Sequence, residues 1–178
     1  PNQDAVNKGM PNLEHHVDLI RSFGLPVVVS INQFPSDTPE EINIVKERTQ
    51  AAGAFARPVH CGFAKGGDGA IELAEAVVKA TSGDRPNITY LYPKEASIEE
   101  KVLSLATKVY GADDAQWSPA ARRQLRAYEK LGWGNLPVCM AKTHLSLSHN
   151  PRLKGKPKGY TFEISEVRAS IGAGFIYP

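Results

Sequence analysis

The 178 residues carry 21 basic and 19 acidic side chains, so the formal net charge at pH 7 is only +2. This near balance argues against a dedicated nucleic-acid-binding protein, which needs a concentrated basic footprint, and it leaves room for anionic small molecules. A hydrophobic fraction of 42% is ordinary for a globular domain, and no apolar run approaches the roughly 20 residues of a membrane span.

Helices and strands alternate in the predicted first half of the chain. In chain order, the patterns predict a helix over 12–23, a strand over 25–31, a helix over 38–52, a strand over 57–63 and a helix over 71–80. The run 25–31 is apolar and β-branched, which is typical of a strand buried on both faces of a parallel sheet. Thr38 and Glu41 form a capping box that fixes the start of the second helix. Because this alternation is typical of βαβ units, we assign residues 1–83 to the parallel part of a nucleotide-binding core.

Residues 84–135 are predicted to be mainly helical, and residues 136–178 are predicted to return to the sheet. Helices are expected over 97–109 and 118–131, and strand-like runs lie at 136–141, 160–167 and 173–177. The chain starts at Pro1 and stops within the last apolar run, so we expect it to be part of a longer protein, truncated at its C-terminus. The predicted fold class is α/β: a parallel-sheet core portion, a helical insertion and a C-terminal α/β part.

Polar and glycine-rich loops follow the two predicted strands of the first half. Asn32 and Asp37 lie after the first strand, at the carboxyl edge where open parallel sheets bind their ligands. Short polar side chains there also stabilise turns and cap helices, so both roles stay open. Lys65, Gly66 and Gly67 follow the second strand, where glycines let a ligand approach the backbone and free amides attract anions. A plain flexible loop is the alternative.

Three aromatic side chains and one lysine lie at the edges of predicted elements. Phe63 stands at the mouth of the glycine-rich loop, Tyr92 in a short apolar segment and Trp133 between two glycines. Each ring can stack on a flat ligand or pack in a core. Lys142 follows the apolar run 136–141, and a lysine there is a point charge suited to phosphate or carboxylate.

The chain resembles formate–tetrahydrofolate ligases in segments that keep their order along its whole length. The most specific segment is Asn-Leu-Pro-Val-Cys-Met-Ala-Lys-Thr at 135–143. Further matching segments lie at 9–16, 23–32, 36–38, 64–70, 109–113, 145–151 and 170–175. The forms Thr143-His144 and Ser148-His149-Asn150 resemble the eukaryotic trifunctional proteins, in which the ligase is fused to dehydrogenase and cyclohydrolase domains.

The resemblance implies an ATP-dependent ligase of one-carbon metabolism. Members phosphorylate formate with ATP, and the folate amine then attacks formyl phosphate to give 10-formyltetrahydrofolate, ADP and phosphate. Their phosphate-binding loop, of the Gly-x-x-x-x-Gly-Lys-Thr kind, is absent from this sequence, which resembles the later, C-terminal part of the catalytic unit. We therefore expect a P-loop-NTPase-like core portion and no activity from the isolated chain. A non-catalytic folate- or partner-binding module, and a phosphate-loop relative that activates another carboxylate, are the alternatives.

The resemblance also implies roles for individual residues. Those expected to bind the folate are Phe63, Tyr92 and Trp133, and the expected catalytic residue is Lys142. Those expected to line the nucleotide pocket are Asn32, Asp37, Lys65, Gly66 and Gly67. ATP with Mg²⁺ and tetrahydrofolate are expected as substrates, without a tightly bound cofactor or a protein metal site. The resemblance further implies a homo-oligomer in the cytoplasm, or alternatively in mitochondria, without nucleic-acid or membrane partners.

Overall fold

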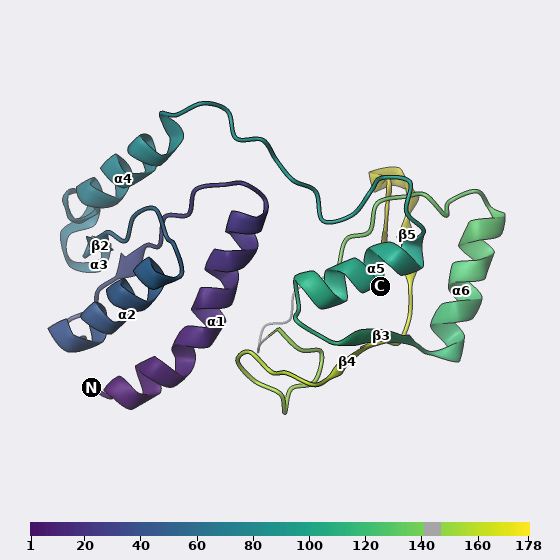
Figure 1. Ribbon diagram of the computed structural model, residues 1–178, viewed down its shortest axis with the longest axis horizontal. Coiled ribbons are helices and arrows are strands. Elements are labelled where there is room, and N and C mark those ends of the chain that lie inside the picture. Colours follow the sequence, from purple (N-terminus) through teal and green to yellow (C-terminus); the bar gives the residue numbers. More distant parts are fainter. Residues whose placement is uncertain (141–146) are drawn as a thin grey trace. The chain divides into compact units, whose positions relative to one another are not determined.

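The structure, a computed structural model, describes residues 1–140 and 147–178, which form two compact units (Figure 1). Unit 1 spans Pro1–Thr89 and unit 2 spans Tyr90–Pro178. Unit 1 contains, in chain order, α1 (Gln3–Ser22), β1 (Ile31–Asn32), α2 (Pro39–Ala51), β2 (Val59–His60), α3 (Gly62–Lys65), the short 3₁₀ helix η1 (Gly66–Ala70) and α4 (Ile71–Thr81). Helices and strands therefore alternate in this unit, as the sequence predicts.

The start of α2 confirms the predicted capping box. The Thr38 hydroxyl accepts a hydrogen bond from the Glu41 N–H at 3.3 Å, and the Glu41 carboxylate accepts one from the Thr38 N–H at 3.1 Å. Hydrogen bonds from the backbone of Thr38 and of Asn2 stabilise the charged carboxylate, and they lower the pKa of Glu41 below its ordinary value. The helix boundary is thus fixed by local chemistry that a sequence can reveal.

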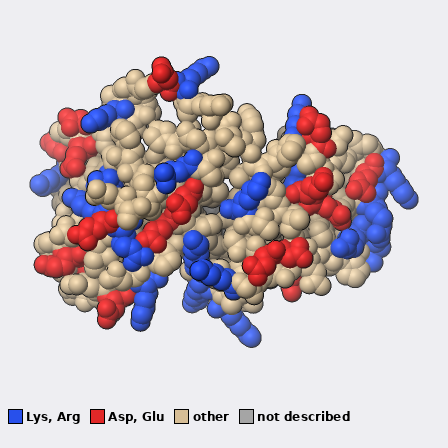
Figure 2. Space-filling view, viewed as in Figure 1, with Lys and Arg blue, Asp and Glu red and all other residues tan. Residues whose placement is uncertain are grey.

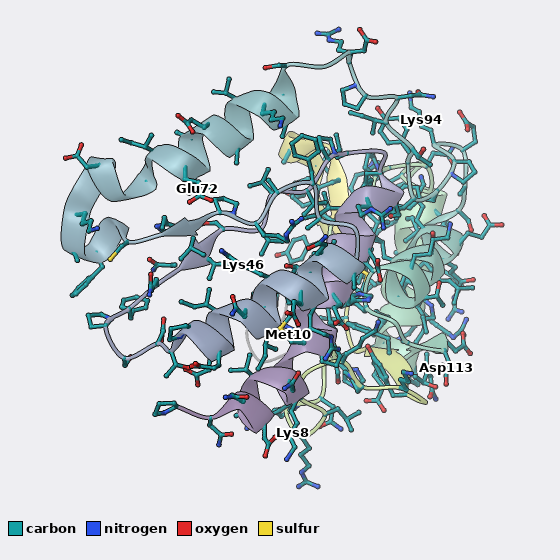
Figure 3. The ribbon with its side chains drawn as sticks, turned by 60° about the vertical axis from the view of Figure 1, so that its left-hand side comes forward. Lys8, Met10, Lys46, Glu72, Lys94 and Asp113 are labelled. Atoms are coloured by element: carbon teal, nitrogen blue, oxygen red, sulfur yellow. The ribbon has the colours of Figure 1, made fainter. Side chains whose placement is uncertain are left out.

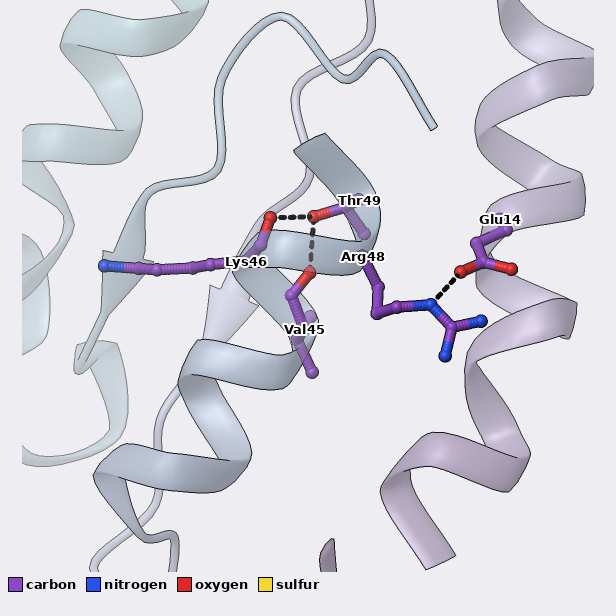
Figure 4. Close-up of polar contacts among 5 residues, drawn as sticks. All are labelled: Glu14, Val45, Lys46, Arg48 and Thr49. Carbon is purple, nitrogen blue, oxygen red and sulfur yellow. Dashed lines mark hydrogen bonds and ion pairs between the residues drawn. The ribbon is translucent and has the colours of Figure 1, made fainter. Parts of the chain in front are cut away.

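Helices α1 and α2 pack against each other and are joined by an ion pair (Figure 4). The Arg48 Nε lies 2.6 Å from the Glu14 Oε1, and both side chains are half-buried. The next residue of α2, Thr49, is fully buried, and its hydroxyl donates to the Val45 carbonyl at 2.6 Å. The buried hydroxyl is therefore satisfied within its own helix.

Strands β1 and β2 pair in parallel, in the register that places Asn32 opposite His60. The pairing resumes towards the N-terminus as one bridge between Val28 and Ala56. Pro58 lies between these two points and has no N–H to donate, so the regular ladder is interrupted. Both strands are consequently shorter than the sequence predicts.

The core of unit 1 is small and lies on one face of this strand pair. Its buried residues come from α1, the β1 segment and the turn after α2: Val17, Val27, Val29, Ile31 and Ala54. The alternation along the β1 segment leaves Ser30 exposed and Val28 half-buried. The prediction of a strand buried on both faces is therefore wrong for the described chain, in which one face is covered fully and the other only in part.

The described residues of unit 2 form two α-helices and two strand pairs. It contains α5 (Ile98–Lys108), β3 (Asp114–Trp117), α6 (Pro119–Lys130), β4 (Thr161–Ile164), β5 (Arg168–Ser170), the 3₁₀ helix η2 (Ile171–Ala173) and β6 (Phe175–Tyr177). β3 and β4 pair in parallel, whereas β5 and β6 pair antiparallel. Strand β3 lies within the segment predicted to be mainly helical, so that segment also contributes to a sheet.

A continuous apolar core holds unit 2 together. Its buried residues include Ile98, Val102, Ala106, Trp117, Leu125, Phe162, Ile164, Val167 and Ile176. Ser97 caps α5 in a second capping box with Glu100, and Ser118 caps α6. Helix α5 contributes every fourth residue to this core, which is the helical spacing expected of a one-sided apolar face.

Residues 136–140 do not form the predicted strand. A single bridge joins Val138 to Ile176, made by hydrogen bonds of 2.9 Å from the Ile176 N–H to the Pro137 carbonyl and from the Cys139 N–H to the Ile176 carbonyl. Pro137 has no N–H with which to extend the ladder. The described residues are thus α/β with small two-stranded sheets, while the P-loop-NTPase-like core and the three-part division stay predictions.

Candidate functional site

The loops that follow β1 and β2 leave the strand pair at the same edge, because the strands are parallel. The Gln33 N–H donates to the His60 carbonyl at 2.9 Å, which ties the two strand ends together. The loop after β1 carries Asn32, which is exposed, and Phe34. The short helix α3, which follows β2, carries Phe63. The carboxyl edge of parallel strands is the usual place for a ligand in open α/β sheets.

Two phenylalanine rings meet at this edge, and both are open to solvent. The centroids of Phe34 and Phe63 are 5.6 Å apart, with the ring planes tilted by 45°. The two side chains are 42% and 73% exposed, so the interpretation of Phe63 as a core residue is wrong. Neighbouring aromatic rings left in water present the apolar ring faces on which a flat ligand can stack. We call this the Phe34–Phe63 pair.

A tight turn holds Phe34 in place. The Asp37 carboxylate accepts a hydrogen bond from the Phe34 N–H at 2.8 Å, and the Asp37 N–H donates to the Phe34 carbonyl at 3.0 Å. Asp37 therefore stabilises the turn, one of the two roles that the sequence leaves open. The next residue, Thr38, rather than Asp37, caps α2. The side chain of Asp37 thus holds the backbone of Phe34 in a turn that directly precedes the N-cap of α2.

Backbone hydrogen bonds close the segment 61–69, which carries Phe63. The Cys61 N–H donates to the Gly69 carbonyl at 3.1 Å, and the Cys61 carbonyl accepts the Lys65 N–H at 3.0 Å. A Cβ at Gly69 would lie 2.6 Å from the Cys61 carbonyl oxygen, and Gly66 has φ +56°. Both positions therefore require glycine, and the predicted glycine-rich loop is instead the 3₁₀ helix η1.

The structure brings several predicted site residues into the two segments that follow the strands. Asn32 and Asp37 lie after β1, Phe63 and Lys65 lie in α3 after β2, and Gly66 and Gly67 begin η1. Lys65, Gly66 and Gly67 are exposed, but the Gly66 N–H already donates to the Gly62 carbonyl. The exposed ammonium of Lys65 suits an anionic group. The arrangement can therefore hold a ligand that combines a flat ring with negative charge.

Tyr92 belongs to unit 2 and contacts the backbone there. Its hydroxyl lies 3.2 Å from the Val138 carbonyl and 3.3 Å from the Val138 N, and the Nζ of Lys101 lies 5.8 Å from its ring centroid. The ring lines a shallow pocket of about 320 Å³ together with Leu91, Pro93, Ala96, Glu100, Ser104 and Lys108. These contacts give Tyr92 a structural role, and its role in folate binding stays a prediction.

Trp133 and Lys142 complete the predicted set. Trp133 is half-buried against the core of unit 2, with its ring centroid 5.7 Å from that of Tyr128. The ring of Trp133 therefore packs against a core, which is one of the two roles that the sequence allows. Lys142 lies outside the described residues.

The candidate site residues expected from the sequence do not include three residues with unusual surroundings: Phe34, His60 and Lys101. Phe34 lies two residues after β1, but the sequence does not reveal its contact with Phe63. His60 has a buried Nδ1 without a hydrogen-bond partner, and no sequence pattern marks it. Lys101 is 1% exposed, and its Nζ donates to the carbonyls of Asn135 and Leu136 at 3.0 and 3.3 Å.

Each unit also carries a charged surface that does not include the aromatic pair. In unit 1, a groove of about 500 Å³ lies between α2 and α4, and Lys46 and Glu72 line it from the two helices (Figure 3). In unit 2, basic side chains gather over α6 (Figure 2), and the exposed ones are Arg122, Arg123, Arg126 and Lys130. Within residues 1–140 and 147–178, no three His, Cys, Asp or Glu side chains gather as a metal site, and no helix is long and apolar enough to cross a membrane.

Parallel strands with exposed aromatic rings at their carboxyl edge are an arrangement that α/β proteins use for small molecules. The chain belongs to the formate–tetrahydrofolate ligase family, whose family model matches residues 1–178. It is 50% identical over 177 residues to the formate–tetrahydrofolate ligase of Desulforamulus reducens, and this match covers 99% of the chain and 31% of that relative.

Longer relatives carry the same segment. The mitochondrial C-1-tetrahydrofolate synthase of Saccharomyces cerevisiae is 47% identical, and the cytoplasmic C-1-tetrahydrofolate synthase of Mus musculus is 46% identical. The matches cover 18% and 19% of these proteins and 99% and 98% of the chain. The chain therefore spans about a third of the bacterial relative and about a fifth of the eukaryotic synthases.

Proposed function

We propose that this chain forms the folate-binding part of an ATP-dependent ligase that joins formate to tetrahydrofolate. The observation that carries the proposal is the solvent-exposed Phe34–Phe63 pair at the strand ends. Exposed aromatic faces suit a flat, partly apolar ring such as the pterin of tetrahydrofolate. Membership of a family named for formate and tetrahydrofolate supports the choice of ligand.

The reaction that we propose for the whole ligase proceeds through formyl phosphate. Formate takes the terminal phosphoryl group of ATP and releases ADP, and the folate amine then displaces phosphate from the activated formyl group. In this proposal, ATP enters with Mg²⁺ as a substrate, and the P-loop-NTPase-like core includes unit 1. Lys65, beside Gly66 and Gly67, faces an anionic part of a substrate, and Lys142 acts near phosphate or carboxylate.

The proposal includes the setting in which the chain works. We propose small-molecule substrates and a homo-oligomer, with fused dehydrogenase and cyclohydrolase domains as an option that the greater length of the eukaryotic relatives supports. Those relatives are named cytoplasmic and mitochondrial, and we propose the cytoplasm for this chain. Tyr92 and Trp133 remain further candidates for contact with the folate.

A composite ligase tests the proposal. Residues 1–178 replace the matching 177 residues of the Desulforamulus reducens ligase, and formation of 10-formyltetrahydrofolate from formate, ATP and tetrahydrofolate is measured. We call this protein the composite ligase. Phe34→Ala and Phe63→Ala should each raise the KM for tetrahydrofolate about 2- to 13-fold, since an aromatic contact adds about 0.5–1.5 kcal/mol beyond the buried area.

Phe55→Ala is the matched control for these variants. Phe55 is 47% exposed in the same unit, but it lines the groove between α2 and α4 instead of the strand edge. Its removal should leave the KM for tetrahydrofolate unchanged, and all three variants should leave the KM for ATP unchanged. An active composite ligase in which Phe63→Ala has the same KM for tetrahydrofolate as the parent would refute the assignment of the pair.

A further inference from the structure

Helix α4 carries apolar side chains on two of its faces. One face, formed by Leu73, Ala76 and Ala80, is half-buried, on a helix that contacts β2. A second stripe runs along another side of the helix, and its members are Ile71, Ala74, Val77 and Val78. A helix that is apolar on two sides is normally buried between two layers.

The second stripe has no cover within unit 1, which contains α4. Ile71, Val77 and Val78 are 55%, 44% and 64% exposed, and no residue of α4 is buried. The charged side chains of α4, Glu72, Glu75 and Lys79, lie together on the side between the two apolar faces, so they do not interrupt the stripe. Leaving three aliphatic side chains in water forgoes the stabilisation of about 25 cal/mol for each Å² of apolar surface buried.

We propose that this stripe, Ile71–Ala74–Val77–Val78, docks on another part of the ligase polypeptide, outside the segment that this chain matches. The length of the relatives supports this occupant, because 69% of the Desulforamulus reducens ligase lies outside the match, given that the match covers 31% of it. A part of the same polypeptide is already held nearby, so its docking is not opposed by the full entropic cost of association.

The size of the stripe argues against a second copy of this chain as the occupant. A stable interface between separate molecules uses about 20–30 residues on each side. One stripe on an 11-residue helix offers far fewer, whereas a tethered segment needs only a small apolar contact. The inference rests on family membership and on the exposure of α4, and it does not depend on the Phe34–Phe63 pair.

Thiol labelling at position 78 tests the proposal. Val78→Cys is introduced into the 178-residue chain and into the composite ligase, and a small maleimide is added. Mass spectrometry of the peptide that contains position 78 measures the labelling rate there, independently of Cys61 and Cys139. We expect labelling to be at least about tenfold slower in the composite ligase, because a buried thiol reacts only when the contact opens. Glu75→Cys, on the charged side of α4, should react equally fast in both proteins.

The other outcomes overturn the proposal. Equal labelling of position 78 in the two proteins would show that the stripe stays open. Protection in the 178-residue chain that increases with protein concentration would identify a second copy as the cover, and protection at every dilution would place the cover within the chain itself. A composite ligase that does not fold also counts against the proposal, since a matching cover should stabilise α4.

Discussion

Asp37 is the side chain that connects the turn after β1 to the aromatic pair. Its carboxylate accepts the Phe34 N–H at 2.8 Å, so it fixes the backbone from which the Phe34 ring projects. Asp37→Ala should raise the KM for tetrahydrofolate of the composite ligase about fivefold, because a net hydrogen bond contributes about 1 kcal/mol. Asp37→Asn retains an acceptor oxygen and should restore most of the affinity. Equal losses for both variants would contradict this positioning role.

Within the described residues, the buried cation of Lys101 is held by backbone carbonyls and makes no ion pair. Its Nζ donates to two backbone carbonyls and faces the ring of Tyr92. Burial lowers the pKa of Lys101 below its ordinary value, and the charge of Glu95 partly opposes this shift. The folded state thus releases the lysine proton at a lower pH than the unfolded chain does.

The lowered pKa of Lys101 predicts a pH dependence of stability with a definite sign. Between the folded pKa and the ordinary lysine pKa, the unfolded chain binds more protons, so the contribution of Lys101 to stability rises with pH. Lys101→Met removes this contribution. The free energy of unfolding of the parent, minus that of Lys101→Met, should therefore increase as the pH rises towards the ordinary lysine pKa.

Denaturant titrations followed by tryptophan fluorescence measure this difference. Burial also raises the pKa values of Tyr110 and Tyr160, which lowers stability at alkaline pH, but these groups are present in both proteins and cancel in the difference. A difference that is constant with pH would show that the buried ammonium keeps its ordinary pKa.

At the scale of the elements, helix starts could be predicted from sequence, whereas strand lengths could not. The capping boxes of Thr38 with Glu41 and of Ser97 with Glu100 involve residues three apart, so the sequence contains all of their chemistry. A strand needs a partner that is distant in the chain, and the apolar runs do not show where Pro58 or Pro137 will interrupt it. The same reasoning explains β3, which pairs with a strand more than forty residues later.

In the candidate site too, positions set by the local sequence could be predicted, whereas contacts between distant segments could not. Asn32, Asp37 and Phe63 could be placed at the strand edge because a parallel strand pair was predicted. The sequence does not single out the ring of Phe34. Its importance depends on the 5.6 Å separation from Phe63, a contact between segments that are distant in the chain. Trp133 illustrates the opposite case, in which flanking glycines suggest a loop but the ring packs against Tyr128.

The capping box of α5 predicts a loss of stability in acid. Hydrogen bonds from the Ser97 backbone and hydroxyl lower the pKa of Glu100 below its ordinary value. The carboxylate therefore contributes stability above the ordinary glutamate pKa, and this contribution is lost as the pH falls through the folded pKa. Glu100→Gln keeps a side chain that serves in capping boxes, but it does not titrate. The stability difference between parent and Glu100→Gln should shrink in acid, as measured by thermal melts of unit 2.

Ser97 provides a second measurement of the same cap. Ser97→Ala should lower the free energy of unfolding of unit 2 by about 1 kcal/mol at neutral pH, the usual cost of losing an N-cap side chain. Glu129→Gln, a change at an exposed position on α6, should leave stability within about 0.5 kcal/mol of the parent. Equal effects of Ser97→Ala and Glu129→Gln would mean that α5 does not depend on its cap.

At the scale of the whole molecule, the two units contain separate cores of different size. The described residues of unit 1 bury a cluster of five hydrophobic residues, whereas those of unit 2 bury a cluster of fourteen, and the clusters share no member. Because hydrophobic burial is the main favourable contribution to folding, unit 2 should be the more stable. The core of unit 2 includes Val102, whose side chain is 0% exposed.

This difference in core size predicts two unfolding transitions that two probes can separate. Both tryptophans of the chain, Trp117 and Trp133, belong to unit 2, so tryptophan fluorescence follows that unit, whereas far-ultraviolet circular dichroism follows the helices of both. The circular dichroism signal should begin to fall at a lower temperature than the fluorescence changes. Val17→Ala, which costs about 2 kcal/mol for its lost buried methyl groups, should shift only the first transition, and Val102→Ala only the second. Coincident transitions by both probes, or a shift of both transitions by either variant, would show that the units unfold as one.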